Sequence, residues 1–319
     1  MKAKIKKLNI GALGIIIIAT VLAGTNSVAL KYASGTMDPL VFAALRALAI
    51  GTILLLFVTH YRSVFSRKNL IRLVPSVILL LSFISFNAVG VSQSGALKAS
   101  VYALTIPVFV YIFSITLLHE PLIKRIFFGG VVTLIGSMLM IGLPVVFGQS
   151  LVLSDIYLLA GYAALAGAII HGKYMFKWLT PNELLGARFM FAGLLLAGYL
   201  LIARGPAIFT DGEGGAWLAL IFSVVVGGAI VNTLFYRGIR KIRAEQAAPL
   251  IYIDPMSTAL LATLLLGETL DLIALIGVVV IIVGVIIAFP HHHHLMHHYL
   301  HPKNHRARRV LERLIHPLR

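Results

Sequence analysis

Two stretches of the chain share one pattern of proline, glycine and glutamate, GALKASVYALTIPVFVYIFSITLLHEPLI at residues 95–123 and AEQAAPLIYIDPMSTALLATLLLGETLD at residues 244–271. A shift of 148 positions superposes Pro107 on Pro255 and Glu120 on Glu268. The same shift superposes the glycine pairs Gly90 and Gly238, Gly129 and Gly277, and Gly136 and Gly284. These are not the leucines and isoleucines that coincide by chance in any apolar chain. The pattern therefore indicates an internal repeat.

The repeat extends toward the N-terminal side of both stretches with a slightly different offset. A shift of 142 positions superposes Lys31-Tyr32 on Lys173-Tyr174, Pro39 on Pro181 and Arg46 on Arg188. We therefore expect two similar halves, at residues 11–145 and 154–289. They are flanked by a basic arm at residues 1–10 and a histidine-rich tail at residues 290–319.

The composition excludes a water-soluble globule, because 59% of the 319 residues are hydrophobic, only 12% are charged and the mean hydropathy is +0.96. Apolar runs recur at close to the roughly 20 residues that a helix needs to cross a bilayer. We expect an all-α integral membrane protein with ten transmembrane helices, at about 11–32, 38–59, 70–91, 96–118, 125–143, 155–175, 181–202, 216–235, 245–266 and 272–289. The absence of cysteine excludes disulfides and thiolate metal sites.

Five helices per half is an odd number, so the second half should cross the membrane in the opposite direction to the first. Glu120 should then lie on the inner side and Glu268 on the outer side. Inverted repeats of this kind are typical of secondary carriers, whose halves exchange roles as the site opens to alternate sides.

The positive charges fix the expected orientation. With the N-terminus inside, 22 of the 27 Lys and Arg residues fall on the inner side, so both termini should be cytoplasmic. Lys2, Lys4, Lys6 and Lys7 precede an apolar run, but the run is too long for a cleaved signal peptide and should be the first helix. The net charge of +16 then indicates contact with anionic lipid at the cytoplasmic face rather than with nucleic acid.

The two quoted stretches, together with PLVFAALRALAIGT at residues 39–52, resemble the repeated EamA domain of the drug/metabolite transporter superfamily. The resemblance covers about residues 10–290. It implies ten helices around a central cavity, located in a bacterial inner membrane, and the export or exchange of small metabolites such as amino acids. The superfamily also contains nucleotide-sugar, sugar and drug carriers, so the substrate stays open. Asp254, directly before Pro255, departs from the family pattern, as does the long tail.

Asp254 is the first candidate for substrate binding or proton coupling. It lies about ten residues into its helix, roughly 15 Å deep and near the midplane of the bilayer. A carboxylate at that depth is costly unless it is paired or faces water. The alternative is a permanently paired or protonated side chain. Pro107 and Pro255 each remove a backbone hydrogen bond and should kink their helices near the centre.

Further polar groups lie inside the expected helices. Arg46 and Arg188 offer bidentate forks for a substrate carboxylate, but structural pairing or snorkelling explains them equally. The other candidates either line a cavity or hold helices together, and Tyr102 and Tyr252 are the best placed to line one. The full set of these others is Asn26, Asn87, Tyr102, Tyr111, His171, Asn232 and Tyr252.

Glu120 and Glu268 should cap the helices that follow them. Gly129 and Gly136, like Gly277 and Gly284, place small residues on one helical face for close packing.

The tail holds 9 of the 12 histidines. It suits either a helix on anionic lipid or a metal site, with His291, His292, His293, His294, His297 and His298 as the ligands. No nucleotide-binding or hydrolase motif occurs in a supporting context, so neither a cofactor nor an enzymatic activity is expected.

We therefore expect a secondary transporter of a small molecule, with protons as a potential coupling ion and a homodimer as an open alternative. Two other functions stay open. One is a cation or metal carrier that uses Asp254 and the tail. The other is an intramembrane enzyme acting on a lipid-linked substrate, which would need its acid and base groups at one depth.

Overall fold

The computed structural model describes residues 10–33, 35–58, 64–94, 102–119, 123–141, 152–242, 244–254, 257 and 272–288. Every regular element in these ranges is a helix. The chain divides into two units, Met1–Ala288 and Phe289–Arg319, and all described residues belong to the first. Glu120, Pro255, Glu268 and the tail histidines therefore lie outside the described residues, so the expectations for them stay predictions.

The helices fall close to the expected positions. The first half contains α1 (Ile10–Ala33), α2 (Pro39–Leu56), α4 (Arg67–Ser94), α6 (Ile106–Leu118) and α7 (Lys124–Ile141). The second half contains α9 (Leu153–Met175), α10 (Pro181–Arg204), the short 3-10 helix η1 (Pro206–Phe209), α11 (Gly214–Phe222), the π-helix η2 (Ser223–Ile230), α12 (Val231–Lys241), α13 (Ala244–Ile251) and α15 (Leu272–Ala288). The segments α11, η2 and α12 follow one another without a break.

The described helices have the length and apolar character of a multi-pass membrane protein. Five stretches are long and apolar enough to cross a bilayer, namely Pro39–Leu56, Arg67–Val91, Leu153–Met175, Pro181–Arg204 and Gly214–Lys241. Shorter apolar helices cover Ile10–Thr25, Ile106–Leu118 and Leu275–Ala288. Large apolar side chains point outward, including Ile202 at 90% exposure. Such surfaces are stable against lipid acyl chains, which confirms the all-helical membrane class.

The helices α2 and α10 begin in the same way. Asp38 precedes Pro39 and accepts hydrogen bonds from the backbone N–H groups of Leu40 and Val41, at 2.8 and 3.2 Å. Thr180 precedes Pro181 and forms a capping box with Glu183.

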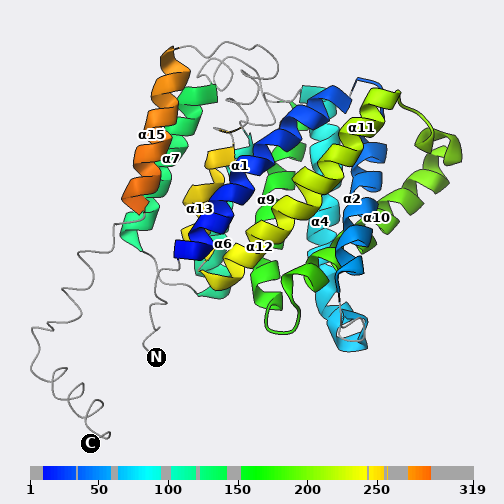
Figure 1. Ribbon diagram of the computed structural model, residues 1–319, viewed down its shortest axis with the longest axis horizontal. Coiled ribbons are helices and arrows are strands. Elements are labelled where there is room, and N and C mark those ends of the chain that lie inside the picture. Colours follow the sequence, from blue (N-terminus) through cyan, green and yellow to red (C-terminus); the bar gives the residue numbers. More distant parts are fainter. Residues whose placement is uncertain are drawn as a thin grey trace, which may run out of the picture. The chain divides into compact units, whose positions relative to one another are not determined.

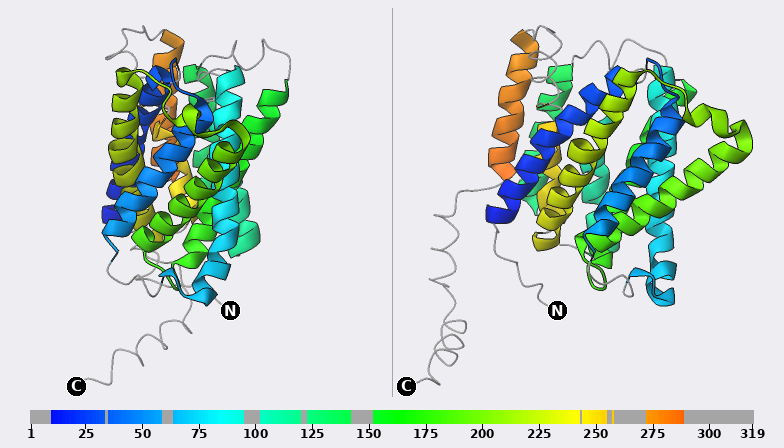
Figure 2. Two further views of the ribbon diagram at one scale, coloured as in Figure 1. Left: turned by 90° about the vertical axis from the view of Figure 1, so that its right-hand side faces the viewer. Right: turned by 45° about the vertical axis from the view of Figure 1, so that its right-hand side comes forward.

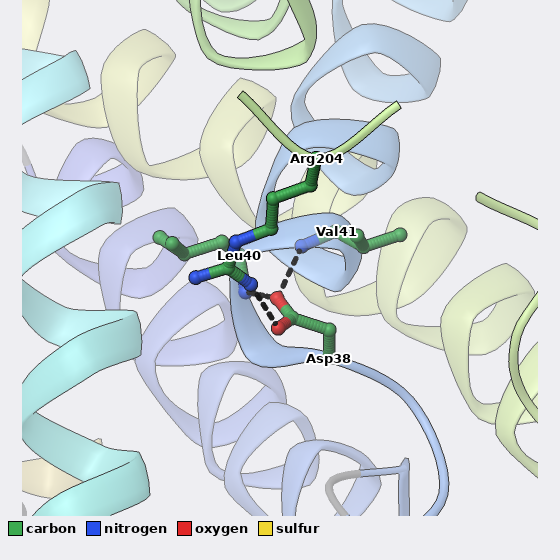
Figure 3. A network of polar contacts seen from close by, with 4 residues as sticks. All are labelled: Asp38, Leu40, Val41 and Arg204. Atoms are coloured by element: carbon green, nitrogen blue, oxygen red, sulfur yellow. Dashed lines mark hydrogen bonds and ion pairs between the residues drawn. The ribbon is translucent and has the colours of Figure 1, made fainter. Parts of the chain in front are cut away.

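Asp38 also joins two distant parts of the chain, because its other carboxylate oxygen forms an ion pair at 2.8 Å with Arg204. Figure 3 shows the Asp38 carboxylate with its contacts to Leu40, Val41 and Arg204 drawn as dashed lines. The start of α2 is thereby tied to the end of α10.

Glycines bring α2 and α10 into close antiparallel contact. A Cβ atom on Gly51 would lie 2.5 Å from the backbone nitrogen of Met190, and one on Gly193 would lie 2.7 Å from that of Leu48. The two contacts involve equivalent residues of the repeat, since Met190 and Gly193 lie 142 positions after Leu48 and Gly51. Only glycine permits this approach of two backbones.

The helices α7 and α15 meet in the same manner and lie side by side in Figures 1 and 2. A Cβ atom on Gly136 would lie 2.6 Å from the nitrogen of Ile281, and one on Gly284 would lie 2.6 Å from that of Thr133. Ile281 and Gly284 lie 148 positions after Thr133 and Gly136. The close packing expected from the glycine spacing is confirmed, and the contacting residues show that the helices run antiparallel.

Other contacts between helices also recur between counterparts in the two parts of the repeat. Helix α4 packs along α9, and α12 packs along α1. Helix α6 contacts α9 and α13, while α13 contacts α1. If each helix is replaced by its counterpart in the other half, the pair α4 and α9 becomes the pair α12 and α1.

The expected fourth helix is interrupted before Pro107, and the described part of the ninth contains a turn. Tyr102 and Ala103 are helical, Leu104 and Thr105 form a turn, and α6 then begins with Pro107 in its first turn. Pro107 therefore starts a helix instead of kinking the middle of one, because its missing N–H costs nothing in a first turn. A turn at Tyr252 likewise follows α13, before the helical residues Ile253 and Asp254.

Candidate functional site

A hydrogen bond between Asn87 and Tyr162 joins α4 to α9, and Asp254 lies near Tyr162. The side-chain amide of Asn87 on α4 donates to the hydroxyl of Tyr162 on α9 at 3.0 Å. The carboxylate of Asp254, beyond the turn that follows α13, lies within electrostatic range of the same hydroxyl. Tyr162 is buried, whereas Asn87 and Asp254 are half-buried. Asn87, which the sequence singled out, is thus bound to a tyrosine that it did not single out, and Asp254 is within electrostatic range of that tyrosine.

Local packing explains why Tyr162 is positioned here. Gly161 places the backbone of α9 against α4, because a Cβ atom there would lie 3.3 Å from the Cβ of Phe86. The ring of Tyr162 packs on Phe83 with centroids 6.0 Å apart, and Phe86 stacks on Tyr157 at 5.9 Å. Two pairs of aromatic rings therefore pack where α4 meets α9.

The break beside Asp254 meets the corresponding break in the first half. Leu104, in the turn before α6, and Tyr252, in the turn after α13, are both buried and share one apolar cluster with Ile281. Tyr252 lies 148 positions after Leu104. Tyr252 is thus part of the apolar packing beside the break, and Tyr102, two residues before Leu104, is half-buried.

A second polar cluster surrounds Arg188 on α10, which is only 1% exposed. Its guanidinium donates to the carbonyl of Ala168 at 3.3 Å and lies 4.6 Å from the ring centre of Tyr236. His171 is within electrostatic range of the same cation. Among the described residues, the Nε of Arg188, the Nδ1 of His171 and the hydroxyl of Tyr236 have no hydrogen-bond partner.

Arg46 lies in a different environment from Arg188, although the two occupy equivalent positions. It is half-buried on α2 and donates to the carbonyl of Gly227 in the π-helix η2, at 3.3 Å. Asn232 donates to the carbonyl of Gly228 in its own helix, at 2.8 Å. Both side chains therefore bind main-chain carbonyls at the π-helical segment.

A cavity of about 490 Å³ lies between α4, α6 and α9. Its wall is almost wholly apolar, with Leu79, Phe113 and Gly167 among the lining residues and His171 as one of the few polar ones. It thus adjoins the Arg188 cluster, but neither Asp254 nor Tyr162 lines it.

Some expected site residues are not tested by the structure. The side chain of Asn26 and the tail histidines lie outside the described residues. Within the described part of the chain, no group of three or more His, Asp or Glu side chains could hold a metal ion. Sequence reasoning missed Tyr162 and Tyr236, because a tyrosine inside an apolar helix carries no pattern that separates it from ordinary packing. The one usable signal is the glycine directly before Tyr162.

The chain resembles known proteins over most of its length. It is 22% identical to the uncharacterized transporter YoaV of Bacillus subtilis, over 85% of this chain and 94% of that protein. It is 34% identical to an uncharacterized transporter of Archaeoglobus fulgidus, but this match spans only 26% of the chain and 31% of that relative. A solved crystal structure shares the fold with a TM-score of 0.70 at 19% identity, covering 87% of this chain and 97% of that one.

A family model gives the most extensive match. The model of the EamA-like transporter family matches residues 10–142 and again residues 152–289. Together the two matches cover most of the chain, which therefore belongs to the EamA-like transporter family.

Proposed function

We propose that the protein is a secondary transporter whose ten membrane-spanning helices form two inverted halves, and that it moves a small polar or amphipathic metabolite by alternating access. The observation that carries the proposal is the set of reciprocal contacts between equivalent residues. Gly51 meets Met190 as Gly193 meets Leu48, and the helices involved run antiparallel. Equivalent helices that pack antiparallel about a shared axis are the arrangement of an inverted repeat.

The reciprocal contacts support a mechanism as well as an architecture. Two halves that pack through the same surfaces are close to equal in energy when their roles are exchanged, which a carrier needs to open to either side. Membership of a transporter family supports the same conclusion and favours a carrier over an enzyme. The distribution of Lys and Arg supports an orientation with both termini in the cytoplasm.

We place the substrate or coupling site at Asp254, Tyr162 and Asn87. A half-buried carboxylate beside an interrupted helix is a recurrent feature of carrier sites, because the break frees backbone groups and the acid binds a cation or donor. Substrates with an ammonium group, amino acids among them, match this chemistry. Protons are the coupling ion that a membrane carboxylate suits best.

The surroundings of the candidate acids and bases favour transport over intramembrane catalysis. In the described part of the chain, Asp254 lies near Tyr162, His171 lies near Arg188, and Arg46 binds the carbonyl of Gly227 in η2. An enzyme would need its acid and base to converge on one reacting atom.

The test is uptake and counterflow in proteoliposomes with labelled amino acids, nucleosides, sugars and polyamines, with and without a pH gradient. We expect one compound class to move. Asp254→Asn should lower its rate about tenfold or more, because a hydrogen bond to a charged group contributes about 1.5–3 kcal/mol. Asp211→Asn removes the same charge from an exposed loop and serves as the matched control.

The outcomes separate the carrier from its site. Full transport by Asp254→Asn would refute the assignment of the site but leave the carrier intact. If no compound class moves under any gradient, the proposed activity is overturned.

A further inference from the structure

A second cavity, of about 510 Å³, lies at one end of the helices, and its lining includes none of Asn87, Tyr162 and Asp254. It is formed by the beginning of α1, the end of α2, the beginning of α10 and the end of α12. Figure 2 shows α1 running beside the α11 to α12 stretch. In the orientation that the positive charges indicate, this end faces the cytoplasm.

Three cations of α12 line this cavity. Arg237, Arg240 and Lys241 have the i, i+3, i+4 spacing that puts side chains on one helical face, and all three are exposed. The intervening Gly238 and Ile239 are buried on the opposite side. Phe176 lies beneath the guanidinium of Arg240, with its ring centre 5.9 Å away. The cations therefore form one preorganised basic surface.

The positive charge of this surface exceeds the negative charge beside it. Glu183 also lines the cavity, where its Oε2 accepts the backbone N–H of Thr180 at 2.6 Å and caps α10, so one carboxylate faces three cations. Within the described part of the chain, none of these three cations forms an ion pair with a carboxylate. An anion entering the cavity would supply the missing counter-charge.

The rim of the cavity is apolar on the side of α2. Phe57 lines the cavity and is 71% exposed, and its neighbour Leu56 is 72% exposed. In a membrane protein such side chains contact acyl chains. A basic pocket bordered by lipid-facing side chains, at the end of a bundle, suits an amphiphile with an anionic head better than a freely soluble anion.

The basic surface is not part of the internal repeat. The residues 148 positions earlier are Val89, Ser92 and Gln93, and none of them is charged. The corresponding opposite end of the chain therefore lacks the three cations. A site present at one end only can distinguish one leaflet of the bilayer from the other.

We propose that this cavity binds the phosphate headgroup of an anionic phospholipid from the cytoplasmic leaflet, through Arg237, Arg240 and Lys241, with the acyl chains passing beside Phe57. Bound lipid would fix the end of α12 against α2 and α10. The site is separate from the proposed transport site, so lipid binding can be measured without any transported substrate.

The test measures lipid binding to the full-length protein in detergent micelles by native mass spectrometry. Dioleoylphosphatidylglycerol and dioleoylphosphatidylcholine are the two probes. The test variant combines Arg237→Gln, Arg240→Gln and Lys241→Gln. The matched control combines Arg67→Gln, Lys68→Gln and Lys177→Gln, which removes three exposed cations outside the cavity.

We expect the wild type to prefer phosphatidylglycerol, and the test variant to bind it about tenfold or more weakly while the control keeps wild-type binding. Equal weakening in both variants would overturn the proposal, because it would reflect surface charge alone. Displacement of phosphatidylglycerol by millimolar inorganic phosphate would also overturn it, since the pocket would then recognise a free anion. Should the triple variant fail to fold, Arg237→Gln alone must still lower phosphatidylglycerol binding.

Discussion

Gly129 offers a sharp test of the packing between α7 and α15. In Gly129→Ala, the new Cβ atom would lie 2.6 Å from the nitrogen of Ala288 and 2.7 Å from the carbonyl oxygen of Gly284. Ordinary contact begins near 3.4 Å, so two helix backbones must separate by about 0.8 Å. Overpacking of this kind costs about 1–3 kcal/mol. The neighbouring residue provides the control, because a Cβ atom on Gly130 would meet nothing within 4 Å.

Gly130→Ala should be neutral or stabilise the helix by up to about 1 kcal/mol, since alanine is the better helix former. Each variant adds one methyl group, at one of two adjacent residues. The difference between their free energies of unfolding therefore isolates the contact between α7 and α15. The assay is equilibrium unfolding of the purified protein in mixed micelles, followed by tryptophan fluorescence and circular dichroism. Equal stability of the two variants would refute the close approach of α7 and α15.

Two further predictions concern single polar contacts. Asp38→Ala should lower the free energy of unfolding by about 1 kcal/mol, because α2 loses its N-cap. Arg204→Ala should lower it by at most about 0.5–1 kcal/mol, because the ion pair is exposed. Equilibrium unfolding in micelles compares the two variants, and an equal or larger loss for Arg204→Ala would contradict the capping argument. Tyr162→Phe should lower the free energy of unfolding by about 1 kcal/mol, because Asn87 loses its hydrogen-bond partner. The same variant should slow transport in proteoliposomes. Unchanged transport by a normally folded variant would remove Tyr162 from the proposed site.

The sequence was sufficient to predict where most of the described helices lie, because apolar runs of about 20 residues mark helices that can cross a bilayer. It also predicted that Gly129 and Gly136 mark a packed face, since two glycines seven residues apart recur in both halves. It could not name the helix that covers this face. Apolar residues face lipid and protein alike in a membrane, so hydrophobicity carries little information about helix pairing.

The candidate site was predictable in part. Asp254 and Asn87 stand out because charged and amide side chains are costly in a bilayer. Tyr162 does not stand out, although it is the residue that the other two share. The position of the helix break was also missed. A proline is read as a kink within a long helix, yet Pro107 occupies the first turn of α6, where its missing N–H has no cost.

The pairing of α7 with α15 has a consequence for biosynthesis. The glycine face of α7 is covered by a helix that the ribosome makes about 148 residues later. Translation adds about 5–20 residues per second, so α7 lacks its partner α15 for roughly 7–30 s. During this time its glycine face can pack against any other helix that has a glycine face. Nascent chains stalled within the second half should therefore be prone to wrong partners and to membrane quality-control proteases, while completion of α15 ends this vulnerable period.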